Sequence, residues 1–308
     1  MIPAAERLLA ALVGSPAGVN AATVPESALH ELLRRGHEIV RAGDRMVLRC
    51  AAQHFDPQAF IAACQGQIGR SFEVWESTSS TNDRARAGAA TGAPDGAMWF
   101  SETQTEGRGR QGRSWVCNPH AGLLASFLVR TPLDAAARPT LLPLAVGLGA
   151  CEALRAVTGL PLRTKWPNDV LLDGRKLAGI LVEARHGAAP HAVVGLGINV
   201  NDASIAGAIL PLATTLESHG VRLRREVLLA TVLQGIERRI EDWRAARFAT
   251  LVDAWTAVDG SLGCDVSVET GTGRLQGRAA GITPAGLLRL CLADGAIRDL
   301  AAGEVHLQ

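Results

Sequence analysis

The sequence predicts an α+β protein built from three regions, and three observations support this prediction. A chain of 308 residues, 47% of them hydrophobic, can bury more than one core. Strand and helix patterns alternate over 65–258, whereas 259–308 carries short alternating apolar runs separated by frequent glycines. Residues 1–64 differ from both, because two short helical patterns precede a hairpin there. We therefore expect domains over 1–64, 65–258 and 259–308.

The first region has the outline of a winged helix. Helical patterns over 5–13 and 26–35 are followed by a hairpin over 38–50, which turns at the Ala-Gly-Asp sequence of 42–44. A helix followed by a small hairpin is the order found in winged-helix domains. The first region is therefore predicted to be a small winged-helix-like domain.

The second and third regions predict a catalytic body and a small barrel. Strand patterns and longer helical patterns alternate in the second region, which is typical of an α/β or α+β body. The strand patterns cover 97–100, 179–183 and 192–200, and the helical patterns cover 141–158 and 226–244. Short strands with frequent turn residues in the third region indicate a small β-barrel.

Composition excludes several classes of protein. The net charge of +1 gives no basic surface for nucleic acid or an anionic membrane. The longest apolar stretch, 141–150, is too short for a membrane span, and Glu6 and Arg7 interrupt any signal peptide. Six scattered cysteines form no C-x-x-C pair, and we predict no metal site. We expect a soluble, cytoplasmic protein without a membrane contact.

The segment 107–112 reads GRGRQG and matches the glycine pattern of dinucleotide sites, but its flanks are wrong for such a site. A polar run separates it from the preceding strand, and Pro119 opposes a following helix. Glycines permit a tight turn, while Arg108, Arg110 and Arg113 offer forked donors to carboxylate or phosphate. We interpret the segment as a loop that clamps an anion. A solvated loop and an RNA-binding loop are the alternatives.

Two lysines stand out because the chain has 29 Arg and only two Lys, Lys165 and Lys176. Lysine and arginine are not interchangeable where a compact point charge is needed. Trp-Pro follows Lys165 directly, so we expect its side chain to project from a rigid strand end, where it could stabilise a reacting phosphoryl or acyl group. For Lys176, a solvated place in a hairpin is the alternative. Asn168 and Asp169 are interpreted either as turn formers or as residues that orient metal-bound phosphates.

With these motifs, the chain resembles the biotin protein ligases, which attach biotin to a lysine of the carrier domain of acetyl-CoA carboxylase. The resemblance rests on five blocks in the family's order: SSTN at 79–82, ETQ and GRGRQGRSW within 102–115, KWPND at 165–169, RKLAGILVE at 175–183 and GLGINV at 195–200. It implies a class II synthetase-like catalytic domain with a mixed central sheet. The last fifty or so residues resemble the family's SH3-like barrel.

The resemblance implies a ligation in two steps. Biotin's carboxylate attacks the α-phosphate of ATP, which is used with Mg²⁺, to give biotinyl-5'-AMP and pyrophosphate. The carrier lysine then displaces AMP, so biotin and ATP are substrates rather than resident cofactors. Both steps bring negative charges together and need cations already in place.

The resemblance also assigns site residues. Lys165 and Arg110 are the implied catalytic residues. The implied biotin-binding residues are Ser80, Thr81, Asn82, Gln104, Arg108, Gly109, Arg110, Trp115, Lys165, Gly179 and Leu181. The implied nucleotide-binding residues are Arg108, Arg110, Arg113, Lys165, Lys176, Gly197 and Asn199. A helix N-cap at 80–82 is compatible with biotin binding, and close strand packing is the alternative for Gly195 and Gly197.

The chain departs from family members that also act as repressors. Their winged helix has two helices before the recognition helix, whereas 14–23, between the two helical patterns of this chain, is too short and too weakly helical for the extra helix. Residues 1–56 carry six Arg and six acidic residues, without the basic excess of an operator-binding domain. We therefore predict a degenerate winged helix and argue against specific DNA binding. Ala213 stands where a repressor-type ligase can place an aromatic residue over adenine, which leaves open any coupling of adenylate formation to dimerisation.

Two competing functions remain. Lipoate ligases and octanoyl transferases of the same superfamily also acylate a carrier lysine, but they lack the Gly-Arg loop and the KWPND block. A biotin-responsive repressor, with or without ligase activity, is the alternative from another class. The neutral first region argues against it. The carrier domain is the expected partner, and a homodimer is implied by analogy alone.

Overall fold

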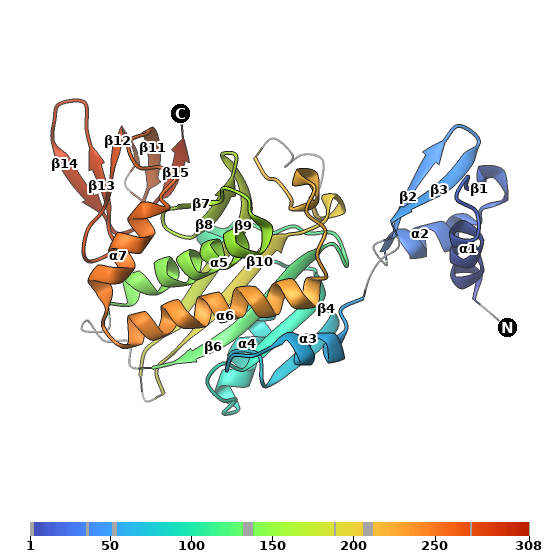
Figure 1. The fold of residues 1–308 in the computed structure, drawn as a ribbon, viewed down its shortest axis with the longest axis horizontal. Coiled ribbons are helices and arrows are strands. Elements are labelled where there is room, and N and C mark those ends of the chain that lie inside the picture. The colour runs from blue at the N-terminus through green and yellow to red at the C-terminus, as the bar shows by residue number, and fades with distance from the viewer. Residues whose placement is uncertain are drawn as a thin grey trace.

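The computed structural model describes residues 3–34, 37–50, 54–131, 138–187, 189–205, 212–271 and 273–307. Figure 1 shows an N-terminal unit beside a central sheet with helices on its faces, followed by a second, smaller sheet at the C-terminal end. The predicted α+β class is therefore confirmed.

The N-terminal unit combines two helices with a three-stranded sheet in the order β1-β3-β2. Its core joins Leu8 and Leu12 of the first helix to Leu32 of the second. Between these helices the described chain has one strand and one short 3-10 turn, Ala21–Thr23, as its weakly helical sequence predicts. The elements are α1 (Ala4–Val13), β1 (Val19–Asn20), α2 (Glu26–Arg34), β2 (Glu38–Ala42) and β3 (Arg45–Cys50). The winged-helix assignment stays a prediction.

The central sheet has seven strands in the order β4-β5-β6-β10-β9-β8-β7. The β4 and β5 strands pair in parallel and the other neighbours pair antiparallel, so the sheet is mixed as expected. Its strands are β4 (Phe72–Thr78), β5 (Met98–Gln104), β6 (Gly122–Arg130), β7 (Arg163–Lys165), β8 (Asp169–Leu172), β9 (Arg175–Arg185) and β10 (His191–Asn199).

Helices cover the two faces of this sheet, with α5 (Leu142–Thr158) and α6 (Arg225–Arg244) side by side on one and α4 (Thr81–Ala90) on the other (Figure 1). Alternation along β5 separates the faces: Met98 joins the large core, whereas Trp99 packs with the alanines of α4. Two glycines let α5 and α6 approach closely, because a Cβ on Gly149 would lie 2.6 Å from the backbone oxygen of Gly235.

The helix α5 belongs to the core of the protein. The stretch Pro139–Thr158 is long and apolar enough to cross a membrane, but 67% of its most apolar window is buried inside the structure. Leu148 and Leu154 within it are completely buried in the large core. We therefore interpret it as a core helix.

The chain enters the central body through α3 (Pro57–Ala63). Asp56 caps this helix by accepting the backbone N–H of Gln58 and Ala59. Phe55 and Phe60 are buried in the large core. The end of the predicted 1–64 region thus packs with the central body.

The C-terminal sheet has five antiparallel strands in the order β14-β13-β12-β11-β15. It follows α7 (Phe248–Ala257), and Val266, Leu290 and Val305 of its inner face join the large core. The strands are β11 (Asp265–Thr270), β12 (Gly273–Ile282), β13 (Leu288–Cys291), β14 (Ile297–Leu300) and β15 (Glu304–Leu307). This sheet agrees with the small, SH3-like β-domain that the sequence predicts.

A buried ion pair joins the central sheet to α6. The Arg225 guanidinium donates two hydrogen bonds to the Glu102 carboxylate, at 2.7 and 3.0 Å, and the two side chains are 4% and 2% exposed. Burial alone would raise the pKa of Glu102, but His120 and Arg225 beside it lower this pKa to about 2. The carboxylate is therefore ionised at neutral pH.

We expect Glu102→Gln to lower the free energy of unfolding by about 3–5 kcal/mol, because it removes the charge of a buried carboxylate that pairs with the buried Arg225 guanidinium. Urea unfolding at neutral pH measures the change. Glu152→Gln is the matched control, because its pair with Arg239 is partly exposed and its loss should cost about 1 kcal/mol or less. Equal losses in the two variants would contradict the prediction.

Candidate functional site

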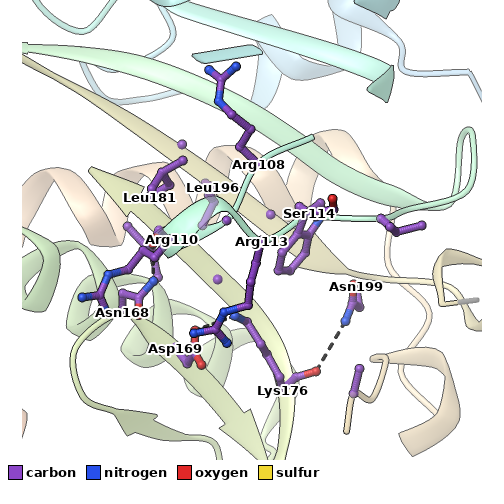
Figure 2. Close-up of a pocket in the computed structure, with 18 of the residues that line it drawn as sticks. Arg108, Arg110, Arg113, Ser114, Asn168, Asp169, Lys176, Leu181, Leu196 and Asn199 are labelled. Carbon is purple, nitrogen blue, oxygen red and sulfur yellow. Dashed lines mark hydrogen bonds and ion pairs between the residues drawn. The ribbon is translucent and has the colours of Figure 1, made fainter. Parts of the chain in front are cut away.

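A cavity of about 480 Å³ lies between the central sheet, the 107–115 segment and strand β15. All the residues that the sequence assigned to biotin or nucleotide binding line it: Ser80, Thr81, Asn82, Gln104, Arg108, Gly109, Arg110, Arg113, Trp115, Lys165, Lys176, Gly179, Leu181, Gly197 and Asn199. Figure 2 shows part of this lining, with Arg108, Arg110, Arg113, Lys176, Leu181 and Asn199 among the labelled residues. The structure thus brings together residues from five separate blocks of the sequence.

One end of the cavity carries a network of polar side chains at the start of α4. The Thr81 hydroxyl and backbone N–H both donate to the Gln104 side-chain oxygen, at 3.1 and 2.7 Å. The Ser126 hydroxyl lies 2.7 Å from the Thr81 hydroxyl and 2.6 Å from the Asn82 amide oxygen. Ser80 occupies the N-cap position, but its hydroxyl makes no capping hydrogen bond. This end can therefore offer buried donors and acceptors to a polar ring.

Trp115 forms one wall of the cavity above two glycines. A Cβ on Gly197 would lie 2.4 Å from the Trp115 ring, and one on Gly179 would lie 2.8 Å from it. The Lys176 ammonium lies 5.5 Å from the centre of the same ring. Close packing therefore explains why glycine is needed at 179 and 197, and the same packing places Trp115 in the cavity.

The Gly-Arg loop closes on itself through its backbone. Gly109 N–H donates to the Arg113 carbonyl at 2.7 Å, and Trp115 N–H donates to the Gly107 carbonyl at 2.8 Å. Gly112 has a positive φ of 74°, which a side chain would oppose. The loop is thus a tight turn that backbone hydrogen bonds close, so the arginine side chains are not needed to form it.

The three loop arginines have different partners. Arg108 donates twice to Asp83 of α4, at 3.0 and 2.5 Å, and Figure 2 shows its side chain directed away from Arg110 and Arg113. Arg113 pairs with Glu304 of β15 at 2.7 Å. In this arrangement Asp83 holds the Arg108 guanidinium apart from those of Arg110 and Arg113, and the role of Arg108 in ligand binding stays a prediction.

Arg110 is the loop cation that faces neutral acceptors. Its guanidinium lies 3.4 Å from the Asn168 side-chain oxygen and 3.3 Å from the Gly303 carbonyl. Burial lowers the pKa of Arg110, whereas hydrogen bonds to Asp83 and Glu304 raise the pKa values of Arg108 and Arg113. Among the loop arginines, Arg110 therefore keeps the charge that is least compensated and best placed for an anion.

Both lysines of the chain contact one buried carboxylate. Lys165 ends β7, as predicted, and its ammonium lies 3.1 Å from Asp169, while that of Lys176 lies 2.7 Å from it. Burial alone would raise the pKa of Asp169, but Lys176 and Lys165 keep it below its ordinary value. Asp169 thus holds two cations toward the cavity. The alternative of a solvated Lys176 is not borne out.

Asn168 has a different task from its neighbour. The side-chain amide of Asn168 donates to the Ile180 carbonyl at 2.5 Å, and the backbone carbonyl of Asn168 accepts a hydrogen bond from the Ile180 N–H at 2.9 Å. These bonds fix the turn before β8 against β9. The turn-former interpretation therefore suits Asn168, while Asp169 acts on the lysines.

Sequence reasoning missed the contribution of the C-terminal sheet. Strand β15 lines the cavity, and its Val305 carbonyl accepts a 3.0 Å hydrogen bond from the Lys165 ammonium. It also missed Ser126, whose signal is a lone hydroxyl in an apolar strand, and the Glu183 carboxylate, which accepts from Asn82 at 2.7 Å. Ala213 lines the cavity beside Lys176, with the small side chain noted in the sequence.

The family models match two parts of the chain. The Biotin/lipoate A/B protein ligase family matches residues 74–199, and the Biotin protein ligase C terminal domain matches residues 261–307. The first match contains four of the five blocks and all but the last residue of the fifth, and the second contains β11 to β15.

Full-length relatives agree with these matches. The chain is 37% identical to a biotin–acetyl-CoA-carboxylase ligase of Mycobacterium tuberculosis over 251 residues, which are 79% of this chain and 91% of the relative. It is 27% identical to a bifunctional ligase/repressor of Bacillus spizizenii over 91% of this chain and 87% of that protein. The structure of an Aquifex aeolicus biotin protein ligase with biotin and ATP superposes with a TM-score of 0.67 at 30% identity, over 78% of this chain and 99% of that one. The chain therefore belongs to the biotin protein ligase family.

Proposed function

We propose that this protein is an ATP-dependent ligase that converts biotin to biotinyl-5'-AMP and transfers biotin to a lysine of the biotin carboxyl carrier domain of acetyl-CoA carboxylase. The observation that carries the proposal is that the network of polar side chains at α4 lines the same cavity as Arg110, Lys165 and Lys176. A ligand with a polar ring at one end and an anion at the other matches this division.

The cations of the cavity explain how two anions can react. The biotin carboxylate and the α-phosphate of MgATP repel each other in water, and preplaced cations remove that barrier without rearranging at the moment of reaction. Lys165 and Lys176 are held by Asp169, and Arg110 faces neutral oxygens. We assign Lys165 to the developing charge between the two anions, and Lys176 and Asn199 to the nucleotide.

The network at α4 accounts for selection of biotin. The ureido ring of biotin has one carbonyl acceptor and two N–H donors, and Ser80, Thr81 and Asn82 supply hydroxyl and amide groups beside it. Lipoate and octanoate have no such ring, so they cannot exchange hydrogen bonds with this polar network.

One experiment tests the proposal directly. The protein is incubated with MgATP and a biotin carrier domain, with biotin, lipoate or octanoate in parallel, and the mass of the carrier is followed. A biotin-sized increase confined to one lysine is the expected result. A lipoyl or octanoyl increase, or none at all, would reject the proposal.

Asp169→Asn should lower the rate of adenylate formation by up to about 100-fold, because small displacements of catalytic groups are that costly. The amide keeps the shape of the side chain but loses the charge that holds both lysines. Initial rates of biotin-dependent pyrophosphate release measure the effect. Asp173→Asn, in the exposed turn after β8, is the control and should remain close to wild type.

Three finer points belong to the same proposal. We place the protein in the cytoplasm, where carrier and ATP occur, and infer that a homodimer is compatible with its family. We also propose that it does not bind a specific operator, since residues 1–56 have no basic excess. A gel-shift assay with biotin and ATP tests the last point, and light scattering tests the oligomeric state.

A further inference from the structure

A cluster of titratable side chains lies outside the cavity, where the chain enters the central body. It consists of His54, Glu76 of β4, Glu102 of β5 and His120, none of which lines the cavity. The His120 side chain is completely buried, at 0% exposure. Neither of its ring nitrogens makes a hydrogen bond to any residue that the structure describes. A buried imidazole whose nitrogens make no hydrogen bond destabilises the folded protein, unless a bound ion or molecule contacts those nitrogens.

The distances in this cluster suit a shared cation. His120 Nε2 lies 3.1 Å from Glu76 Oε1, and His54 Nδ1 lies 3.6 Å from Glu76 Oε2. The centres of the two imidazole rings are 4.4 Å apart. Two ligand atoms that are each about 2.1 Å from a tetrahedral metal ion lie about 3.4 Å from each other. The two distances to the Glu76 carboxylate lie on either side of that value, and one ligand atom each of His54, Glu102 and His120 lies within 4.8 Å of the other two.

We propose that His54, Glu76 and His120 bind a divalent transition-metal ion, with Zn²⁺ as the best match. Imidazole and carboxylate are ligands that Zn²⁺ prefers, and three protein ligands leave one position for water. The His54 and Glu76 side chains are 60% and 65% exposed, so the ion can enter from solvent. His120 supplies the buried ligand.

Glu102 acts as the outer partner of this site. Its carboxylate already accepts from Arg225 and from the Phe55 backbone N–H at 2.5 Å, so little capacity remains for direct metal binding. Its Oε1 lies 3.4 Å from His120 Nδ1. A carboxylate beside Nδ1 orients the imidazole ring, so that Nε2 is the nitrogen available to bind a metal. The ion would fasten His54, and with it the chain that leads from the N-terminal unit, to strand β4.

The competing interpretation is an imidazolium that bridges Glu76 and Glu102. A bridging imidazolium would direct its two N–H groups along the lines to the two carboxylate oxygens. Neither nitrogen of His120 has that geometry, although both carboxylates lie within 3.4 Å. The arrangement therefore favours a metal ion over a proton.

Zinc titration of the full-length, chelator-treated protein tests the proposal, with a chromogenic chelator as competitor. We expect one equivalent to bind, and His54→Ala and Glu76→Gln each to weaken binding by about tenfold or more. Both replaced side chains are exposed, so folding should be preserved. His306→Ala is the matched control, because its exposed pair with Glu269, at 3.8 Å, lacks a third donor.

A second measurement uses Co²⁺ in place of Zn²⁺. A site with few ligands gives Co²⁺ a strong visible absorption, which we expect in wild type and His306→Ala but not in His54→Ala. Binding of less than one equivalent of Zn²⁺ by wild type would overturn the proposal. So would wild-type affinity in both His54→Ala and Glu76→Gln, or an unchanged Co²⁺ spectrum in His54→Ala.

Discussion

Replacing Lys165 with alanine should abolish the formation of biotinyl-5'-AMP while leaving the protein folded. The Lys165 ammonium lines the cavity and is held by Asp169 at 3.1 Å and by the Val305 carbonyl at 3.0 Å. Removal of one preplaced donor from a reacting oxyanion costs about 10²–10³ in rate. In the proposed reaction the lost group is a full charge between two anions, so we expect a loss of at least about 100-fold.

Exchange of labelled pyrophosphate into ATP, measured with and without biotin, reports the first step alone. Arg163→Ala is the control, because it removes a cation from the same strand but outside the cavity. Lys165→Arg should remain impaired if a compact ammonium is required. Thermal unfolding checks that each variant is folded. Biotin-dependent exchange near the wild-type rate in Lys165→Ala would remove Lys165 from the reaction.

The parts of the site that follow from local sequence were predictable. A strand that ends at Lys165, a turn that follows it and a closed Gly-Arg loop all depend on residues within a few positions of one another. The same holds for the hairpin of the N-terminal unit and for the apolar core helix α5. In these segments local pattern and tertiary packing agree.

The parts that depend on distant residues were not predictable. Lys165 and the Val305 carbonyl that it contacts are 140 positions apart, and nothing near either residue indicates the other. Arg108 was expected to join the other loop arginines, but Asp83 of α4 captures it. The direction of the Arg108 side chain depends on how α4 packs beside the loop, and the spacing of arginines in the sequence gives no information on that packing. Likewise, His54 and His120 meet only because the chain before α3 crosses the end of β5.

Replacing Arg110 with glycine should release biotinyl-5'-AMP from the protein and cause biotin to appear on bystander proteins. Arg110 is the loop arginine whose guanidinium faces neutral oxygens. It can therefore bind the adenylate without first breaking an ion pair with a carboxylate. A loop that closes over a reactive acyl phosphate also keeps water and foreign amines away from it. Loss of the guanidinium removes the contacts of the loop with Asn168 and Gly303, and with them the charge that we propose holds the adenylate.

Mass spectrometry of a protein mixture, incubated with each variant, biotin and MgATP, measures this loss of selectivity. Gln111→Gly is the control, because it adds the same backbone freedom to the neighbouring position, where φ is already 55°, and removes no charge. Labelling by Arg110→Gly but not by Gln111→Gly would assign retention of the adenylate to the guanidinium. Equal labelling by both would assign it to stiffness of the loop. If Arg110→Gly were as selective as wild type, the adenylate would have to be held by the other cations that line the described part of the cavity, which are Arg108, Arg113, Lys165 and Lys176.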